Sequence, residues 1–115
     1  MSDGPETTQL YIVLMKLTDR GALDPSPMAE KLSQTLGALD ALEAELLSVD
    51  ATLGEFDYLV RCTGLDQAKM LAFTYYVARE GMFRTTTFAG SPQSDFDTLQ
   101  RLVPPAPVEP RVYRA

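Results

Sequence analysis

Hydrophobic positions along the chain follow two periods, and each period predicts one kind of element. Residues 9–18 form a nearly continuous apolar run with one charged residue, which is typical of a strand covered on both faces. The runs at 45–53 and 55–63, which flank Gly54, and the run at 82–89 are also strand-like. We therefore expect four strands, with the middle two joined by a tight turn or a bulge at Gly54.

Between these strands the apolar residues recur at helical spacing. The first helix is expected to begin at Pro27 with Ser26 as its N-cap, and it carries a row of leucines. Gly37 lies inside this pattern and is expected to bend or split the helix. The second helix is expected between a capping Asp66 and a terminating Gly81.

The two ends of the chain differ from its centre in composition. Residues 1–8 are a polar lead, and residues 9–103 hold every expected element, the last being a short helix that carries Phe96, Leu99 and Leu102. Residues 104–115 are rich in proline, which favours extended polyproline or disorder. We predict one domain over 9–103. Its tail either docks on a partner or remains disordered.

The order of the expected elements is β-α-β-β-α-β. This order predicts an α+β fold of the ferredoxin-like kind, in which a four-stranded antiparallel sheet carries both helices on one face. The other face is then bare, although the first strand is apolar on both sides. A second copy of the same sheet, related by a two-fold axis, is the expected cover, so we predict a homodimer or a higher oligomer.

Composition excludes several classes of chemistry. The chain has 115 residues, no histidine and one cysteine, so it lacks the usual general base, the Ser-His and Cys-His pairs and most zinc sites. We expect no metal and no cofactor. The residues Asp40, Glu43 and Glu45 lie close together in sequence, and a solvated helix end is expected there, with a hard-cation site as the alternative.

Net charge narrows the range of partners. A charge of -6 argues against nucleic acid and against an anionic membrane surface, because both are bound through cationic side chains. Residues 1–57 carry eleven acidic and three basic residues, whereas 58–115 carry seven basic and five acidic ones, which suits an oligomer that joins unlike surfaces. With no secretory signal pattern and no spanning run in the sequence, a cytoplasmic location is predicted.

Charged side chains on neighbouring strands form the candidate site. Lys16 and Thr18 share a face of the first strand, and Asp57 and Arg61 share a face of the third. We expect Lys16, Asp57 and Arg61 to converge, with Asp57 as a tentative catalytic proton acceptor and the cations holding an anionic oxygen. The alternative is structural: an ion pair in the hairpin, with Asp57 accepting backbone N–H bonds beside Gly54. The predicted substrate-binding residues are Lys16, Thr18, Arg61, Arg84 and Tyr75.

Three further residues could bear on a site, and the sequence gives an expectation for each. Of Tyr75 and Tyr76 on the second helix, one is expected to pack in the core while the other shows its hydroxyl to solvent or to the mouth of a cavity. Cys62 alternates with Arg61 on the third strand and is expected to be a buried, inert thiol.

Three segments of the chain resemble one known family. They are YIVLMKLTDRG (11–21), TLGEFDYLV (52–60) and TTTFAGSPQSDF (85–96). They resemble the GYD domain family, with Gly54 and Asp57 on the family's glycine and aspartate and Phe56 in place of its tyrosine. The resemblance implies a dimeric α/β-barrel of ferredoxin-like subunits, similar in architecture to small cofactor-free monooxygenases, isomerases and ligand-sensing domains. It implies a fold and no particular reaction.

Two functions fit these features. The first is a homo-oligomeric barrel that binds a small molecule, either without turnover or as a cofactor-free enzyme that uses carboxylate acid/base chemistry. The second is a non-catalytic ligand sensor or accessory subunit that holds a protein partner through its sheet face or its C-terminal tail.

Overall fold

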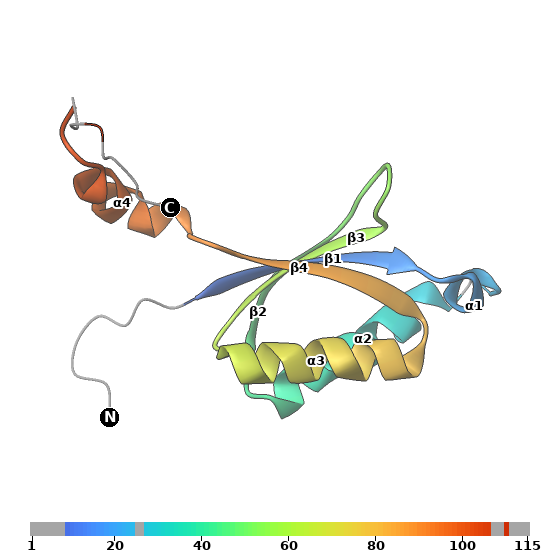
Figure 1. Ribbon diagram of the computed structural model, residues 1–115. Coiled ribbons are helices and arrows are strands. Elements are labelled where there is room, and N and C mark those ends of the chain that lie inside the picture. The colour runs from blue at the N-terminus through green and yellow to red at the C-terminus, as the bar shows by residue number, and fades with distance from the viewer. Residues whose placement is uncertain (1–8, 25–26, 107–109, 111–115) are drawn as a thin grey trace, which may run out of the picture.

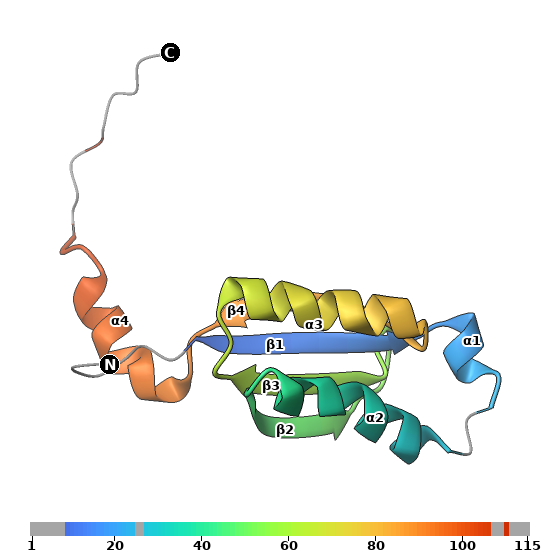
Figure 2. The same cartoon turned by 90° about the horizontal axis from the view of Figure 1, so that it is seen from below.

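A four-stranded antiparallel sheet with two long helices on one face forms the body of the protein (Figures 1 and 2). The computed structural model describes residues 9–24, 27–106 and 110. The elements are β1 (Leu10–Leu17), α1 (Asp19–Ala22), α2 (Met28–Ala41), β2 (Glu45–Ala51), β3 (Tyr58–Thr63), α3 (Gln67–Glu80), β4 (Phe83–Gly90), the 3-10 turn η1 (Gln93–Asp95) and α4 (Phe96–Leu102).

The strand order is β2-β3-β1-β4, with every neighbouring pair antiparallel. Helix α2 connects β1 to β2, and α3 connects β3 to β4, so each helix crosses over the same face of the sheet (Figure 1). This is the ferredoxin-like α+β fold that the order of elements predicts. The edge strands are β2 and β4.

The two faces of the sheet have different environments. On β1, Val13 and Met15 are fully buried and belong to the core cluster beneath the helices. Side chains alternate along a strand, so Ile12 and Leu14 point to the opposite face, where they are only half-buried. We call this helix-free side the open face. In the single chain, therefore, helices cover one face of the sheet, whereas the sequence predicts that both faces are covered.

The core lies between the sheet and the inner faces of α2 and α3. Leu39 of α2 and Phe73 and Val77 of α3 are fully buried there. Phe83 of β4 adds an edge-to-face contact with Tyr58 of β3, whose ring centroid lies 6.0 Å away. Large side chains in close contact make this the stable half of the molecule.

Both ends of α3 agree with the sequence. The Asp66 side chain accepts a hydrogen bond from the backbone N–H of Lys69 at 2.8 Å, as an N-cap does. Gly81 takes a left-handed conformation (φ 76°) and closes the helix. The expectations for α2 need two corrections. It begins at Met28 with Pro27 as N-cap and no capping side chain, and it runs through Gly37 without interruption.

Strand β2 ends earlier than expected, at Ala51, and β3 begins later than expected, at Tyr58. Residues 52–57 lie outside the ladder and form a longer connection than the expected tight turn or bulge at Gly54. Gly54 adopts φ 103° within it, while the bulge of the hairpin lies between Leu46 and Ser48. This connection rises on the side of the sheet away from the helices (Figure 1). A ladder ends where the partner strand ends, which a single run of residues does not reveal.

Two short helices complete the described chain. The segment directly after β1 forms α1, and its Gly21 is buried. After β4, η1 and α4 extend beyond the end of the sheet and lie on the side opposite α2 and α3 (Figure 1). Of the predicted tail, residues 107–109 and 111–115 lie outside the described residues. No helix in the described part is long and apolar enough to cross a bilayer.

Candidate functional site

The open face presents apolar residues at its centre and charged ones around them. Directly paired residues of antiparallel strands point to the same side, so the register shows which side chains are neighbours. Leu14 of β1 lies between Leu59 of β3 and Thr86 of β4. Ile12 lies between Arg61 and Phe88 in the same way. The result is an apolar floor crossed by a few polar groups, an arrangement typical of small-molecule sites.

Two cations lie side by side at one end of this face. Lys16 of β1 pairs directly with Arg84 of β4, and both side chains are exposed. Within the described part of the chain neither side chain forms an ion pair or a hydrogen bond. Like charges directly opposite each other destabilise a sheet. An anion placed between them would remove that repulsion.

Arg61 lies elsewhere on the same face. Its partners in the ladder are Ile12 on β1 and Ser48 on β2. Ile12 is four residues from Lys16, a separation of roughly 13 Å along a strand. The structure therefore pairs Lys16 with Arg84, and it does not bring Lys16 and Arg61 together. The Ser48 hydroxyl beside Arg61 is buried and, among the described atoms, has no hydrogen-bond partner.

Asp57 is bound to the backbone at the end of β1. Its Oδ2 accepts a hydrogen bond from the backbone N–H of Leu17 at 2.7 Å. Its own N–H donates to the carbonyl of Met15 at 2.8 Å, and its carbonyl accepts from the N–H of Thr52 at 2.9 Å. Asp57 thus extends the pairing of β1 by one residue beyond β3. The backbone bonding is that of the structural alternative, whereas Asp57 forms no ion pair among the described residues. Its Oδ1 is left available to a ligand.

The hydroxyl of Thr18 is also engaged with the backbone. It donates to the carbonyl of Gly81 at 2.5 Å and accepts from the N–H of Gly21 at 3.1 Å. It therefore caps α1 and fixes that helix to the end of α3. Because a hydroxyl has a single proton to donate, Thr18 can offer a ligand only an acceptor.

A depression of about 420 Å³ opens beside the paired cations. It lies where β1 ends and β4 begins, at the C-terminal end of α3. Two residues predicted to bind substrate, Thr18 and Arg84, both line it, together with Gly81 and Phe83. The depression and the cation pair thus occupy the same end of the sheet.

Comparison with known proteins agrees with this architecture. The GYD domain family model matches residues 11–99, which is most of the chain. The protein belongs to the GYD domain family. A search of curated proteins finds no match.

The connection between β2 and β3, residues 52–57, carries the family's glycine and aspartate positions, and we call it the GYD turn. Thr52 closes it at the start, donating from its hydroxyl to the carbonyl of Phe56 at 2.6 Å. Asp57 closes it at the end through the bonds to β1 described above. Gly54 holds a positive φ at its exposed tip, beside a fully exposed Leu53. The glycine and aspartate of this GYD protein therefore shape the turn, while Phe56 brings no hydroxyl to it.

The remaining candidates lie away from the open face. Tyr75 is 70% exposed on the outer surface of α3, whereas Tyr76 packs beside the core. Since α3 covers the other side of the sheet, Tyr75 is separated from Lys16 and Arg84 within one subunit. Cys62 is fully buried on the helix side, and this burial raises the pKa of its thiol above the ordinary value of 9.0.

The acidic residues near the end of α2 do not gather into a metal-like group. Among the described residues, no three His, Cys, Asp or Glu side chains are placed to hold one ion. Asp40, Glu43 and Glu45 are each exposed. This is the solvated helix end that the sequence favours.

Proposed function

We propose that this GYD protein is a homo-oligomeric small-molecule-binding protein whose ligand lies on the open face between two copies of the sheet. The observation that carries the proposal is the direct pairing of Lys16 with Arg84, with neither cation held by an acidic group of the described chain. The ligand class this favours is a small carboxylate with an apolar body. Its carboxylate would lie between the two cations and its body over Leu14 and Leu59.

Assembly would strengthen such a site. The open face of one subunit leaves Ile12, Leu14 and Leu59 only half-buried and Phe88 45% exposed. Burying these side chains against a second sheet removes apolar surface from water. The same burial excludes water from Lys16 and Arg84, so each would attract an anion more strongly. One dimer would therefore both bury the apolar face and exclude water from the two unpaired cations.

Asp57 is the candidate proton acceptor if the protein turns its ligand over. It lies beside Lys16, because its amide bonds to the preceding residue, Met15. Its Oδ2 is held by Leu17, so proton transfer would use Oδ1. The cations would then hold the oxygen on which negative charge develops. Catalysis is the finer part of the proposal, and binding does not depend on it.

The second candidate is a ligand sensor or accessory subunit that holds a protein partner. The observation favouring it is the set of apolar side chains exposed outside the strands themselves, on α4 and at Leu53. In that case the sheet face would be filled by protein, and no small molecule would accompany it.

Ligand binding tests the first candidate against the second. The natively purified protein is analysed by mass spectrometry for a copurifying small molecule, and benzoate and hexanoate are titrated while thermal stability is followed. We expect a carboxylate to raise the melting temperature of the wild type and not of Arg84→Gln. The control is Lys69→Gln, an exposed cation at the start of α3 on the other side of the sheet, which should behave as wild type.

Two outcomes would refute the proposal. One is a wild type that copurifies with nothing and responds to no carboxylate, which favours the accessory subunit. The other is an Arg84→Gln protein that responds as well as wild type. Light scattering tests the assembly separately, because a folded monomer at micromolar concentration would contradict the pairing of sheets.

A further inference from the structure

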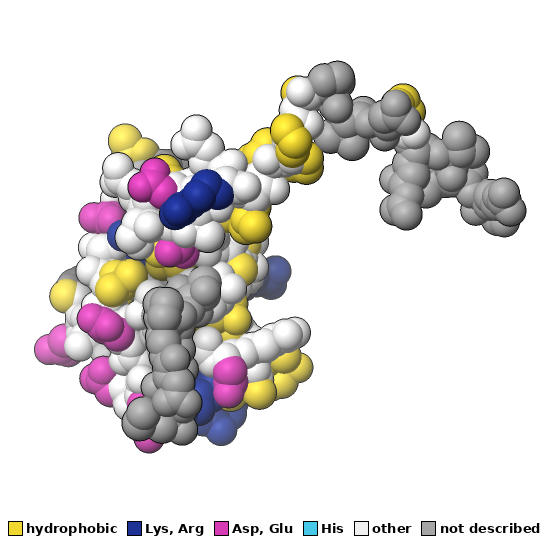
Figure 3. All heavy atoms as spheres, turned by 90° about the vertical axis from the view of Figure 1, so that its left-hand side faces the viewer, with side chains coloured by type: hydrophobic (Ala, Val, Ile, Leu, Met, Phe, Trp, Pro, Cys, Tyr) yellow, Lys and Arg dark blue, Asp and Glu magenta, His cyan; other side chains and the backbone are white. Residues whose placement is uncertain are grey.

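Helix α4 is amphipathic and has an uncovered apolar side. Phe96, Leu99, Leu102 and Val103 recur at helical spacing and are 55%, 42%, 73% and 66% exposed. The opposite side carries Asp97 and Arg101, while Thr98 and Gln100 flank the apolar side. Figure 3 looks onto this end of the molecule, where hydrophobic side chains reach the surface beside charged ones. Three large apolar groups on one short helix, with Val103 directly after it, indicate a contact with another surface.

The body of the same chain does not supply that surface. Among the described elements, α4 packs on η1 and on no other element to a comparable extent. A seven-residue helix is too short to be stable alone in water. It therefore needs a partner surface, and its position beyond the sheet directs it away from its own core (Figure 1).

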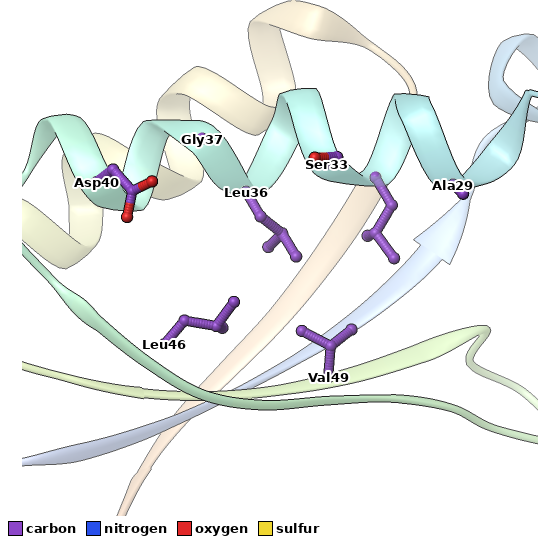
Figure 4. Close-up of a pocket in the computed structure, with 8 residues that line it drawn as sticks. Ala29, Ser33, Leu36, Gly37, Asp40, Leu46 and Val49 are labelled. Atoms are coloured by element: carbon purple, nitrogen blue, oxygen red, sulfur yellow. The ribbon is translucent and has the colours of Figure 1, made fainter.

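A groove of about 360 Å³ between α2 and β2 offers matching chemistry. Leu36 of α2 and Leu46 and Val49 of β2 point toward one another across it (Figure 4). Leu46 is 43% exposed and Leu36 is half-buried, so the groove is accessible in the single chain. We call this the α2–β2 groove.

We propose that α4 is an arm that docks in the α2–β2 groove of a second copy of the chain, reciprocally across a two-fold axis. Its own groove is out of reach. Helix α4 follows β4, and β2 is the opposite edge of the sheet, roughly 14 Å away across three strand spacings. The groove also lies on the helix side of the sheet, whereas α4 lies on the open side (Figure 1).

The topology places a second copy correctly. This inference rests on the face-to-face pairing of sheets in the proposed function. A two-fold axis parallel to the strands reverses the order β2-β3-β1-β4, so β4 of one subunit lies over β2 of its partner. Gly90, at the end of β4, pairs with Leu10, and Glu45, at the start of β2, pairs with Thr63 at the same end of the sheet. The arm therefore leaves its own sheet where the partner's β2 begins.

Charge is compatible with the same occupant. Helix α2 and strand β2 together contain four acidic residues and one basic residue, and Asp40 lines the groove itself. Helix α4 contains one acidic residue, Asp97, and one basic residue, Arg101. An arm without net charge thus brings its apolar side to this groove without repulsion from the acidic surround.

Engineered cysteines test the contact directly. In the double variant Leu36→Cys/Leu99→Cys, each new thiol of the groove would face the arm of the other chain. We expect oxidation to give a covalent dimer on a non-reducing gel. The control Leu36→Cys/Asp97→Cys moves the second thiol to the polar side of α4, where the geometry for a disulfide is lost. The native Cys62 is fully buried and stays in both proteins.

A second pair of variants measures the energetic role of the arm. Leu102→Asp places a charge on the apolar side of α4, and Arg101→Gln changes the net charge by the same amount on its polar side. We expect Leu102→Asp to raise the dimer dissociation constant about tenfold or more, and Arg101→Gln to leave it nearly unchanged. Sedimentation equilibrium measures both, with circular dichroism to verify that the subunits are folded.

The outcomes separate this inference from the proposed function. A stable dimer in which neither double-cysteine variant forms an interchain bond, or in which both form it equally, overturns the docking of α4 and leaves the pairing of sheets in place. A ladder of covalent species beyond the dimer overturns reciprocal exchange. A wild-type protein that is monomeric overturns both proposals.

Discussion

Removing the side chain of Asp57 should destabilise the protein by an amount that its hydrogen bond predicts. Strand β3 begins only at Tyr58, so the N–H of Leu17 has no backbone acceptor on the β3 side of β1. It donates to Asp57 Oδ2 instead, at 2.7 Å. In Asp57→Ala this half-buried N–H loses its acceptor. The expected loss in the free energy of unfolding is about 1 to 3 kcal/mol, the cost of leaving a buried donor unsatisfied.

Asp57→Asn divides that loss into two parts. The amide keeps an oxygen that can accept from Leu17, and only the charge of the acceptor is removed. Hydrogen bonds to charged groups are about twice as strong as neutral ones, so we expect a loss of about 1 kcal/mol. The backbone bonds of Asp57 to Met15 and Thr52 remain in both variants.

Urea unfolding followed by circular dichroism measures these differences, at one fixed protein concentration because assembly contributes to apparent stability. The control is Glu55→Gln, an exposed carboxylate in the same connection, which should change stability by less than about 0.5 kcal/mol. An Asp57→Ala protein as stable as wild type would refute the reasoning. Unchanged stability with lost carboxylate binding would instead assign Asp57 to the ligand.

Two further predictions follow from close packing. Gly21→Ala places a Cβ 2.2 Å from the carbonyl oxygen of Met82 and should cost about 1 to 3 kcal/mol in urea unfolding, whereas the control Gly37→Ala meets nothing within 4 Å and should be neutral or stabilising; equal effects would contradict this. Cys62 should react with a thiol reagent only after unfolding. Because its pKa is raised in the folded state, stability should fall as pH rises above about 9.0, where only the unfolded thiol loses its proton, and Cys62→Ala should lack this part of the pH dependence.

Most of the architecture could be predicted because its signals are local. The caps Asp66 and Gly81 identify α3, and alternation along β1 separates the side of Val13 from that of Leu14. Helix α1 could not be found in this way, because four residues show no period. Its one local signal is Thr18, an N-cap residue directly before an acidic residue, and what fixes the helix is a distant contact with Gly81.

For the candidate site, the sequence could predict which face of the sheet each side chain occupies, but not which side chains are neighbours across strands. Alternation correctly puts Lys16 and Arg61 on one side of the sheet, but the stagger between strands decides which residues meet. That stagger depends on where each ladder begins and ends, a property of pairs of strands. In the observed register Lys16 pairs with Arg84, and Arg61 pairs with Ile12. Of the cluster expected across β1 and β3, Asp57 therefore lies beside Lys16, whereas Arg61 does not, and Lys16 pairs with Arg84 of β4 instead.

Hydrogen-bond saturation gives a physical criterion for reading the polar groups of this sheet. The side chains of Thr18 and Asp57 form hydrogen bonds with backbone atoms. Thr18 holds α1 in place at the end of β1, and Asp57 closes the GYD turn. A group used in this way gains little by meeting a ligand, because it must first give up a bond that stabilises the fold. Lys16 and Arg84 have no such bonds within the described chain, so either can bind an anion without first giving one up. This availability, beside a half-buried apolar face, supports the anion that we propose there. For this reason our proposal rests on the cations and assigns Thr18 to the architecture.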